Sequence, residues 1–152
     1  MIQRIQTLYL VAIVALMVTA IFSPLAYFVA GAEEYKLYAF ALEGAQASYS
    51  TIYMGIVVAL SAVVPLVTIF LFKNRLLQIR LCAVELVLLI GCVAFMAIYY
   101  YLGGRMFADL EFNTQGFQIA IIFPVVSLIL DYLAMRAIFH DEALVRSLDR
   151  IR

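Results

Sequence analysis

The sequence predicts an all-α membrane protein. We expect an up-down bundle of four transmembrane helices, a small extended or β element in the outer loops and an amphipathic cytoplasmic helix at the C-terminus. Of the 152 residues 67% are apolar and 13% charged, against about 45–50% and 25% in soluble domains. Four long uncharged runs, and a basic segment at 73–80 that separates two of them from the other two, support the same fold.

The uncharged runs cover residues 5–32, 44–72, 86–104 and 112–130. A helix needs about 20 mainly apolar residues to cross the hydrocarbon core of a bilayer. We therefore predict one domain over 1–152, with spans at about 5–29, 51–72, 79–102 and 116–139 and a cytoplasmic tail at 140–152. Ala30-Gly31-Ala32 suits a signal peptidase, but the apolar stretch before it exceeds the usual 7–15 residues of a signal peptide.

The basic residues predict the orientation of these spans, because lysine and arginine concentrate in cytoplasmic segments. If the segment at 73–80 is cytoplasmic, both termini are cytoplasmic as well. Eight basic residues then lie inside, and only Lys36 and Arg105 lie outside.

Three prolines, Pro24, Pro65 and Pro124, fall inside the predicted spans. Proline removes a backbone donor and kinks a helix. Membrane helices tolerate this where neighbouring groups satisfy the freed carbonyl. We expect packing kinks at all three positions.

The outer loops contain residues suited to strands. Residues 35–42 are rich in aromatic side chains and are bounded by Glu33-Glu34 and Glu43-Gly44, which favours extended backbone. Residues 105–112 in the second outer loop have a similar character. Two short strands could pair over the mouth of the bundle, or the segments could form an interfacial loop.

The C-terminal segment keeps a helical pattern beyond the fourth span. Apolar residues recur at 144, 148 and 151, and Glu142 precedes Arg146 by one turn, a spacing that stabilises helices. We expect an amphipathic helix, on the membrane surface or continuing the span. Its basic residues are candidate contacts for lipid or a protein partner: Arg146, Arg150 and Arg152.

Two acidic residues, Glu85 and Asp131, lie within predicted spans, where charges are functional candidates. Antiparallel packing of the third and fourth spans would bring them to a similar depth. Their expected partners are Arg136 for Glu85 and Arg80 for Asp131, in an ion-pair cluster that locks the inner end of the bundle. A proton or cation site and side chains that reach the headgroups are the alternatives.

The sequence offers no catalytic or cofactor-binding constellation. His140 is the only histidine, so a bis-histidine haem within one chain is excluded and a histidine-rich metal centre is not expected. Cys82 and Cys92 are ten residues apart in one apolar run, roughly 15 Å along a helix and too far for a disulfide. We expect no enzyme, no cofactor, no metal and no nucleic-acid partner.

Three segments carry a resemblance to a known family: Met1-Ile2-Gln3-Arg4-Ile5-Gln6-Thr7, the basic segment at 73–80, and the run from Asp141 to Arg152. The whole chain resembles the small four-span membrane proteins of Bacteroidetes bacteria grouped as a domain of unknown function of the DUF4293 type. The resemblance implies an inner-membrane location and carries over no activity or site residue.

The function that these patterns favour is contact rather than catalysis. The predicted bundle lacks a polar lining, and a basic cytoplasmic helix follows it. We therefore expect an accessory or scaffold subunit in the bilayer, acting through a protein partner, a second copy or lipid. The alternative is a small oligomeric transporter or channel that uses Glu85 and Asp131.

Overall fold

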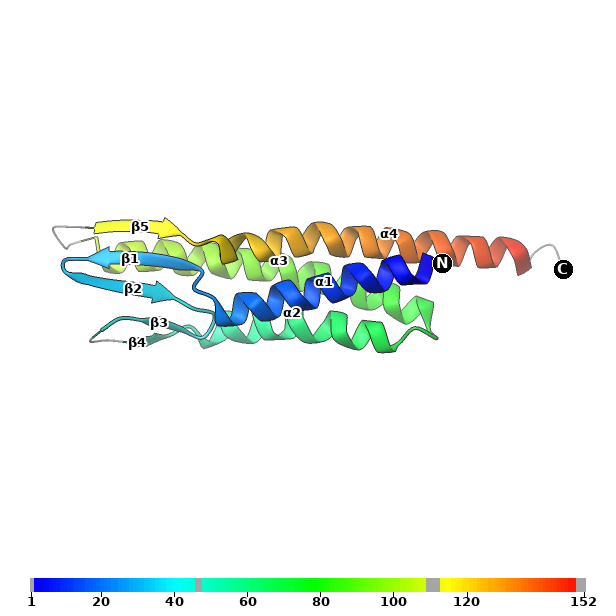
Figure 1. The fold of residues 1–152 in the computed structure, drawn as a ribbon, viewed down its shortest axis with the longest axis horizontal. Helices are drawn as coiled ribbons and strands as arrows, with labels where there is room; N and C mark the ends of the chain where they lie inside the picture. The colour runs from blue at the N-terminus through cyan, green and yellow to red at the C-terminus, as the bar shows by residue number, and fades with distance from the viewer. Residues whose placement is uncertain (1, 46–47, 109–112, 150–152) are drawn as a thin grey trace.

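The chain folds into four long helices with a small sheet at one end (Figure 1). The structure is a computed structural model, which describes residues 2–45, 48–108 and 113–149. The helices are α1 (Ile2–Phe22), α2 (Ile52–Phe70), α3 (Arg75–Met106) and α4 (Phe123–Asp149), and the short 3-10 helix η1 (Ile119–Ile122) precedes α4. Each long helix has the length and apolar composition needed to cross a membrane.

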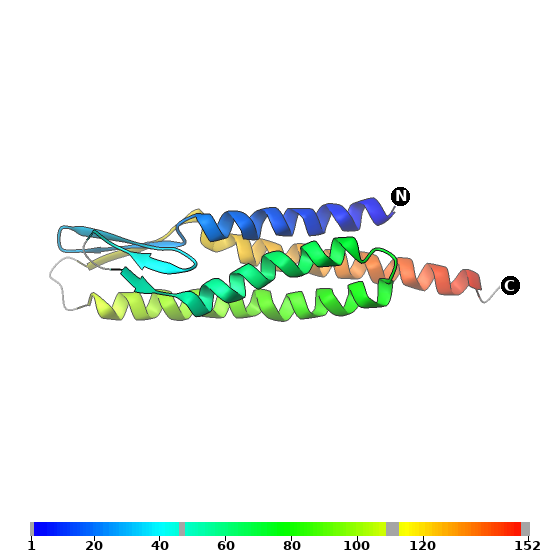
Figure 2. The ribbon, with the colours of Figure 1, turned by 90° about the horizontal axis from the view of Figure 1, so that it is seen from below.

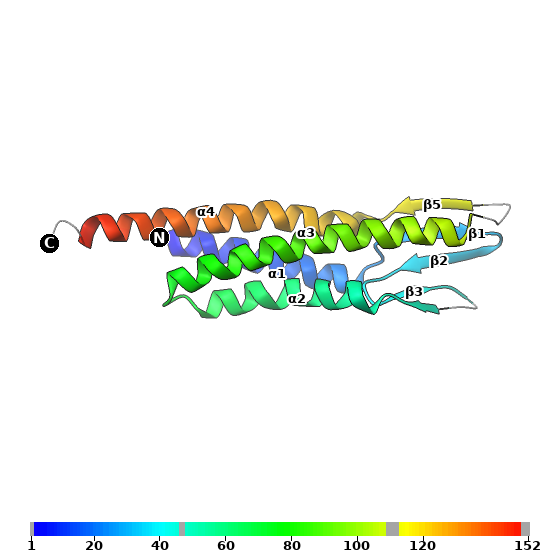
Figure 3. The same ribbon diagram turned by 180° about the vertical axis from the view of Figure 1, so that it is seen from behind.

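The four helices pack side by side, each against two neighbours: α1 and α3 both contact α2 and α4. Consecutive helices run in opposite directions (Figures 1 and 3). The sheet lies at one end, which we call the sheet end. The turn at 71–74 lies at the opposite end, the turn end, together with both termini (Figure 2). Beyond the start of α1, the last turns of α4 project alone.

The sheet has five antiparallel strands in the order β4-β3-β2-β1-β5. Their bounds are β1 (Ala26–Ala30), β2 (Glu33–Leu37), β3 (Ala41–Glu43), β4 (Ser48–Ser50) and β5 (Asn113–Phe117). The turn between β1 and β2 requires Gly31, whose φ of 66° is unfavourable for other residues. On its other side β1 pairs with β5, with Ala26 opposite Phe117 and Ala30 opposite Asn113.

The sheet rests on the last turns of α3. Alternate residues of β1 are buried, as expected for a strand with one covered face. Phe28 of this face packs on Gly103, where an added Cβ would lie 2.7 Å from the Phe28 ring. The same ring lies 5.7 Å from the Tyr100 ring and 6.0 Å from the Phe107 ring, between centroids. This aromatic contact fixes the sheet relative to the helices.

Two predicted spans extend too far toward the sheet. The span at 5–29 is wrong beyond Phe22, because α1 ends there and Ala26–Ala30 forms β1. The span at 116–139 begins too early, because β5 continues to Phe117.

The prolines explain these ends. Pro24 lies in the break between α1 and β1 and ends the helix rather than kinking it. Pro124 lies in the first turn of α4, where no intrahelical partner is needed for its missing N–H group. Pro65 alone lies in a helix interior, in α2.

The extended backbone predicted for residues 35–42 is confirmed by β2 and β3, which form a hairpin. The partner strand predicted at 105–111 is wrong for residues 105–108, because α3 continues to Met106 and a turn follows it. The second outer loop contributes β5 to the sheet instead. Residues 109–112 of that prediction lie outside the described residues. The basic segment at 73–80 is also mostly helical, since α3 begins at Arg75.

Candidate functional site

The space between the four helices contains polar side chains from every helix, so the expected absence of a polar lining is wrong. The buried polar residues of the helices are Gln6 in α1, Ser61 and Thr68 in α2, Gln78 and Glu85 in α3, and Ser127, Asp131 and Asp141 in α4. We call the space that they share the helical core. A polar group buried there is costly unless it is hydrogen-bonded.

Most of these groups have partners. The Gln6 side chain donates a hydrogen bond from Nε2 to Oδ2 of Asp141, at 2.7 Å. Gln78 donates from Nε2 to the carbonyl oxygen of Thr68, at 3.0 Å. The Ser61 hydroxyl lies 3.0 Å from the Val57 carbonyl oxygen, to which it donates. The Gln6 and Gln78 bonds tie α1 to α4 and α2 to α3 near the turn end.

Glu85 and Asp131 are different. They are 1% and 0% exposed, and none of their carboxyl oxygens has a hydrogen-bond partner among the described residues. The hydroxyl of Ser127, one turn from Asp131 on the same helix, is unpartnered in the same way. Buried polar groups in native proteins are nearly always bonded, so these three unsatisfied side chains mark the candidate site.

The helical period explains why both acids face inward. Gln78, Cys82, Glu85 and Leu89 are buried residues of α3 at alternating spacings of four and three, the pattern of one helix face. Buried residues of α4 follow the same rule through Ser127, Asp131, Ala134 and Ile138. Each acid therefore belongs to the stripe by which its helix packs.

The packing of α3 against α4 brings the two acids into one cluster. Asp131 lies near enough to Glu85 and to the Cys82 thiol for a direct electrostatic effect on both. Like charges repel strongly where water is absent. The cluster thus combines two carboxyl groups and a thiol, and no basic side chain of the described residues forms a salt bridge with either acid.

The ion pairs predicted from the sequence are not formed. Arg80 and Arg136 are exposed, and neither forms a salt bridge in the described part of the chain, where the ion pairs are Lys36–Glu34 and Arg146–Glu142. Each arginine is five residues from the acid on its own helix, a rotation of roughly 140°. The prediction considered only the similar depth of the acids and arginines along their helices. The rotation between them places the arginines on the outer faces of α3 and α4.

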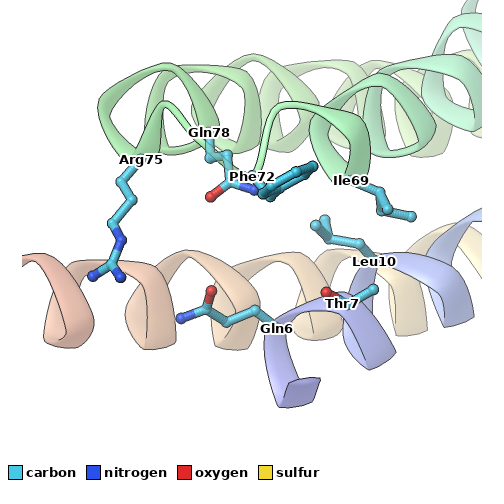
Figure 4. Close-up of a pocket in the computed structure, with 7 residues that line it drawn as sticks. All are labelled: Gln6, Thr7, Leu10, Ile69, Phe72, Arg75 and Gln78. Carbon is cyan, nitrogen blue, oxygen red and sulfur yellow. The ribbon is translucent and has the colours of Figure 1, made fainter. Parts of the chain in front are cut away.

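A pocket of about 460 Å³ opens at the turn end between α1, α2 and the start of α3. Figure 4 shows its lining: Gln6, Thr7, Leu10, Ile69, Phe72, Arg75 and Gln78. Gln78 belongs to the same face of α3 as Glu85, which lies seven residues further, roughly 10 Å along the helix. Polar groups therefore continue from this pocket toward the acidic cluster.

The other candidates from the sequence contribute less. Arg146 is bound to Glu142, with 3.0 Å between Nε and Oε1, while Arg150 and Arg152 lie outside the described residues. Cys82 and Cys92 are both free and buried. Within the described ranges, no group of three or more His, Cys, Asp or Glu side chains could hold a metal ion.

Sequence reasoning missed Gln6, Gln78, Ser127 and Asp141 as members of the helical core. One signal was available for the α3 part: Gln78, Cys82 and Glu85 recur with helical spacing. A single uncharged polar residue does not indicate a buried position. The polar lining becomes evident only when such residues are seen to lie on the buried faces of the packed helices.

The chain matches, over residues 2–151, the model of a family described as a domain of unknown function, DUF4293. The chain belongs to this family. The resemblance of the two termini and the basic segment is thereby confirmed. No curated protein matches the chain. The family description assigns no activity, so the function has to be inferred from the acidic cluster and the helical core.

The unpartnered state of Glu85 predicts how its replacement affects stability. Glu85→Gln should leave the melting temperature in detergent unchanged or raise it, because the amide removes a carboxyl group that has no bonded partner. Gln6→Leu, as a control, should destabilise the protein by about 1–3 kcal/mol, because it leaves the Asp141 carboxyl group unsatisfied. Thermal unfolding in detergent measures both. A lower melting temperature for Glu85→Gln that Arg136→Gln restores would contradict the structure and support the ion pair.

Proposed function

We propose that this protein is an integral membrane protein that transports protons across the bilayer. Glu85 and Asp131 would bind and release the transported proton. The observation that carries the proposal is a pair of buried carboxyl groups on adjacent helices that have no basic partner among the described residues, with only the weakly donating Cys82 thiol beside Asp131. A stability role would call for partners. A site that exchanges protons needs carboxyl groups that are held in place but not neutralised by a fixed cation.

The outer surface of the helices supports insertion in a bilayer. Leu8, Val87 and Ile129 are 65%, 70% and 58% exposed and belong to three different helices. A helix that is apolar on all sides is typical of a membrane span, and soluble monomers avoid apolar patches of this extent. The sheet end and the turn end then flank the apolar layer on opposite sides.

The charge distribution supports an orientation with the turn end in the cytoplasm. Lys73 and Arg75 are at this end, whereas Lys36 and Arg105 are at the sheet end, which would face outward. Both chain termini would then be cytoplasmic.

The energetics favour a proton as the bound species. Burying one unpaired carboxylate is costly, and a second negative charge beside it adds repulsion. A single proton removes the repulsion, because it neutralises one acid. It also lowers the burial cost of the other carboxylate, which can accept a hydrogen bond from the protonated group. Two interacting acids of this kind bind and release protons in steps that describe the pair and cannot be assigned to either residue alone.

The pocket at the turn end supports access from one side. It reaches Gln78, and from there the buried face of α3 leads through Cys82 to Glu85. In the proposed orientation this pocket opens to the cytoplasm. The proton would therefore enter or leave the pair through the turn end in this state.

The second candidate function is that of an accessory subunit that acts by contact. It is favoured by the last turns of α4, which project beyond the other helices (Figure 1). Leu144, Val145 and Leu148 are 45%, 41% and 67% exposed in this projection. They form an apolar face that a partner helix or a lipid surface could cover.

The proposed orientation predicts the location of reporter domains. Fusions after residues 76 and 152 should report the cytoplasm, and fusions after residues 40 and 110 should report the outside, because lysine and arginine are retained inside. Paired reporters that are active on only one side of the membrane measure this. An external signal from the fusion after residue 76 or 152 would contradict the orientation.

The proposed function predicts proton movement through liposomes that contain the purified protein. An imposed pH gradient should dissipate faster with the wild type than with Glu85→Gln or Asp131→Asn, which should approach the rate of empty liposomes. A pH-sensitive dye inside the liposomes measures the rate. Glu142→Gln is the matched control, because this acid is on α4 but is bound to Arg146 outside the core, and it should behave as the wild type.

Two outcomes of this experiment would reject transport. If the wild type dissipates the gradient no faster than empty liposomes, the contact function is favoured. If the two acidic variants remain as fast as the wild type, any flux does not use the pair. Circular dichroism of each variant establishes that its helices are intact.

A further inference from the structure

A second pocket lies between α1 and α4 at the turn end. Its volume is about 800 Å³, in the range of sites for small ligands. Ile5 and Tyr9 line it from α1, and Leu133, Arg136, Ala137 and His140 line it from α4. It is distinct from the pocket at Gln78, which lies between α1, α2 and α3, and from the acidic cluster in the helical core.

The pocket contains two basic side chains that are not engaged by acids. Arg136 and His140 are four residues apart on α4 and therefore lie on one face of the helix. Both are exposed. The acids that follow them on α4 are occupied elsewhere: Asp141 accepts a hydrogen bond from Gln6, and Glu142 is paired with Arg146. Asp131, five residues before Arg136, is buried in the helical core. Throughout the described residues, neither Arg136 nor His140 forms a salt bridge.

The order of residues along the pocket matches the polarity of a phospholipid. Along α4, Ala143 and His140 lie nearest the turn end, followed by Arg136, and then Leu133 toward the middle of the helix. On α1, Ile5 is 49% exposed and offers an apolar wall to the same pocket. Ile5 lies at the level of His140, because its neighbour Gln6 is bonded to Asp141. In the bilayer proposed above, the two basic residues would meet the headgroup level, and Leu133, deeper along α4, would meet an acyl chain.

We infer that this pocket binds one anionic phospholipid, with its phosphate at Arg136 and His140 and an acyl chain along Ala137 and Leu133. Guanidinium groups bind phosphate oxygens through paired N–H donors. A free inorganic phosphate would leave the apolar wall uncovered. A second copy of the chain would need an acidic patch opposite Arg136. The lipid alone satisfies both parts of the pocket, and the inference does not depend on proton transport.

The test is native mass spectrometry of the protein purified in detergent and mixed with equal amounts of phosphatidylglycerol and phosphatidylcholine. The wild type should retain one phosphatidylglycerol in preference to phosphatidylcholine. The double variant Arg136→Gln/His140→Gln should retain it about tenfold less, since each basic residue near an anionic headgroup contributes a several-fold gain in affinity. Arg80→Gln is the matched control, because this arginine is also exposed but lies on α3 outside the pocket, and it should retain the lipid as the wild type does.

A second variant tests whether binding requires the apolar part of the pocket as well as the two basic residues. Ala137→Phe fills the apolar part of the pocket but leaves both basic residues, and it should also lose the lipid. Equal retention of the two lipids by the wild type, or unchanged retention by either the double variant or Ala137→Phe, would overturn the inference. So would displacement of the lipid by millimolar inorganic phosphate, because the phosphate alone would then account for binding.

Discussion

The constraint on which the helical core depends is the closeness of two buried carboxyl groups, which have no salt-bridge partner among the described residues. Glu85 and Asp131 occupy the stripes through which α3 and α4 pack. Neither acid can turn outward without moving its whole helix. The packing that holds the helices together therefore also forces two acids together, and a proton is the smallest species that relieves the conflict.

The rest of the fold keeps this arrangement fixed at both ends. At the turn end, the bonds from Gln6 to Asp141 and from Gln78 to the Thr68 carbonyl join each of α1 and α3 to a neighbouring helix. At the sheet end, Phe28 packs on Gly103 and links the five strands to α3. Because the helices are held together at both ends, Glu85 and Asp131 lie in a constrained part of the helical core. A change in the protonation of either acid there would alter how α3 and α4 pack.

The sequence predicted the helices well because a long uncharged run permits few alternatives. The prediction of helix ends from the sequence failed where an apolar run continues from a helix into a strand. Ala26–Ala30 is as apolar as the helix before it, and only Pro24 and the aromatic residues signalled a strand. The polar strand β5 carried no hydrophobic alternation at all, so its pairing with β1 depended on tertiary structure.

The candidate site was predicted in part. Glu85 and Asp131 were identified because charged residues are rare in apolar helices, and their proximity followed from antiparallel packing. Their pairing with Arg80 and Arg136 was wrong, because five residues of helix rotate a side chain away from the core. Gln78 and Gln6 were missed, since a single glutamine near a helix end has no distinctive pattern until the faces of several helices are assembled.

The most direct test of the account is infrared difference spectroscopy of the protein in lipid nanodiscs. The account predicts the carbonyl stretch of a protonated carboxylic acid at neutral pH, which is lost in the Glu85→Gln/Asp131→Asn double variant. It also predicts that the band disappears and returns as the pH is cycled. A spectrum in which both acids are ionised at neutral pH, with no such band in the wild type, would contradict the shared proton and restore the ion-paired alternative.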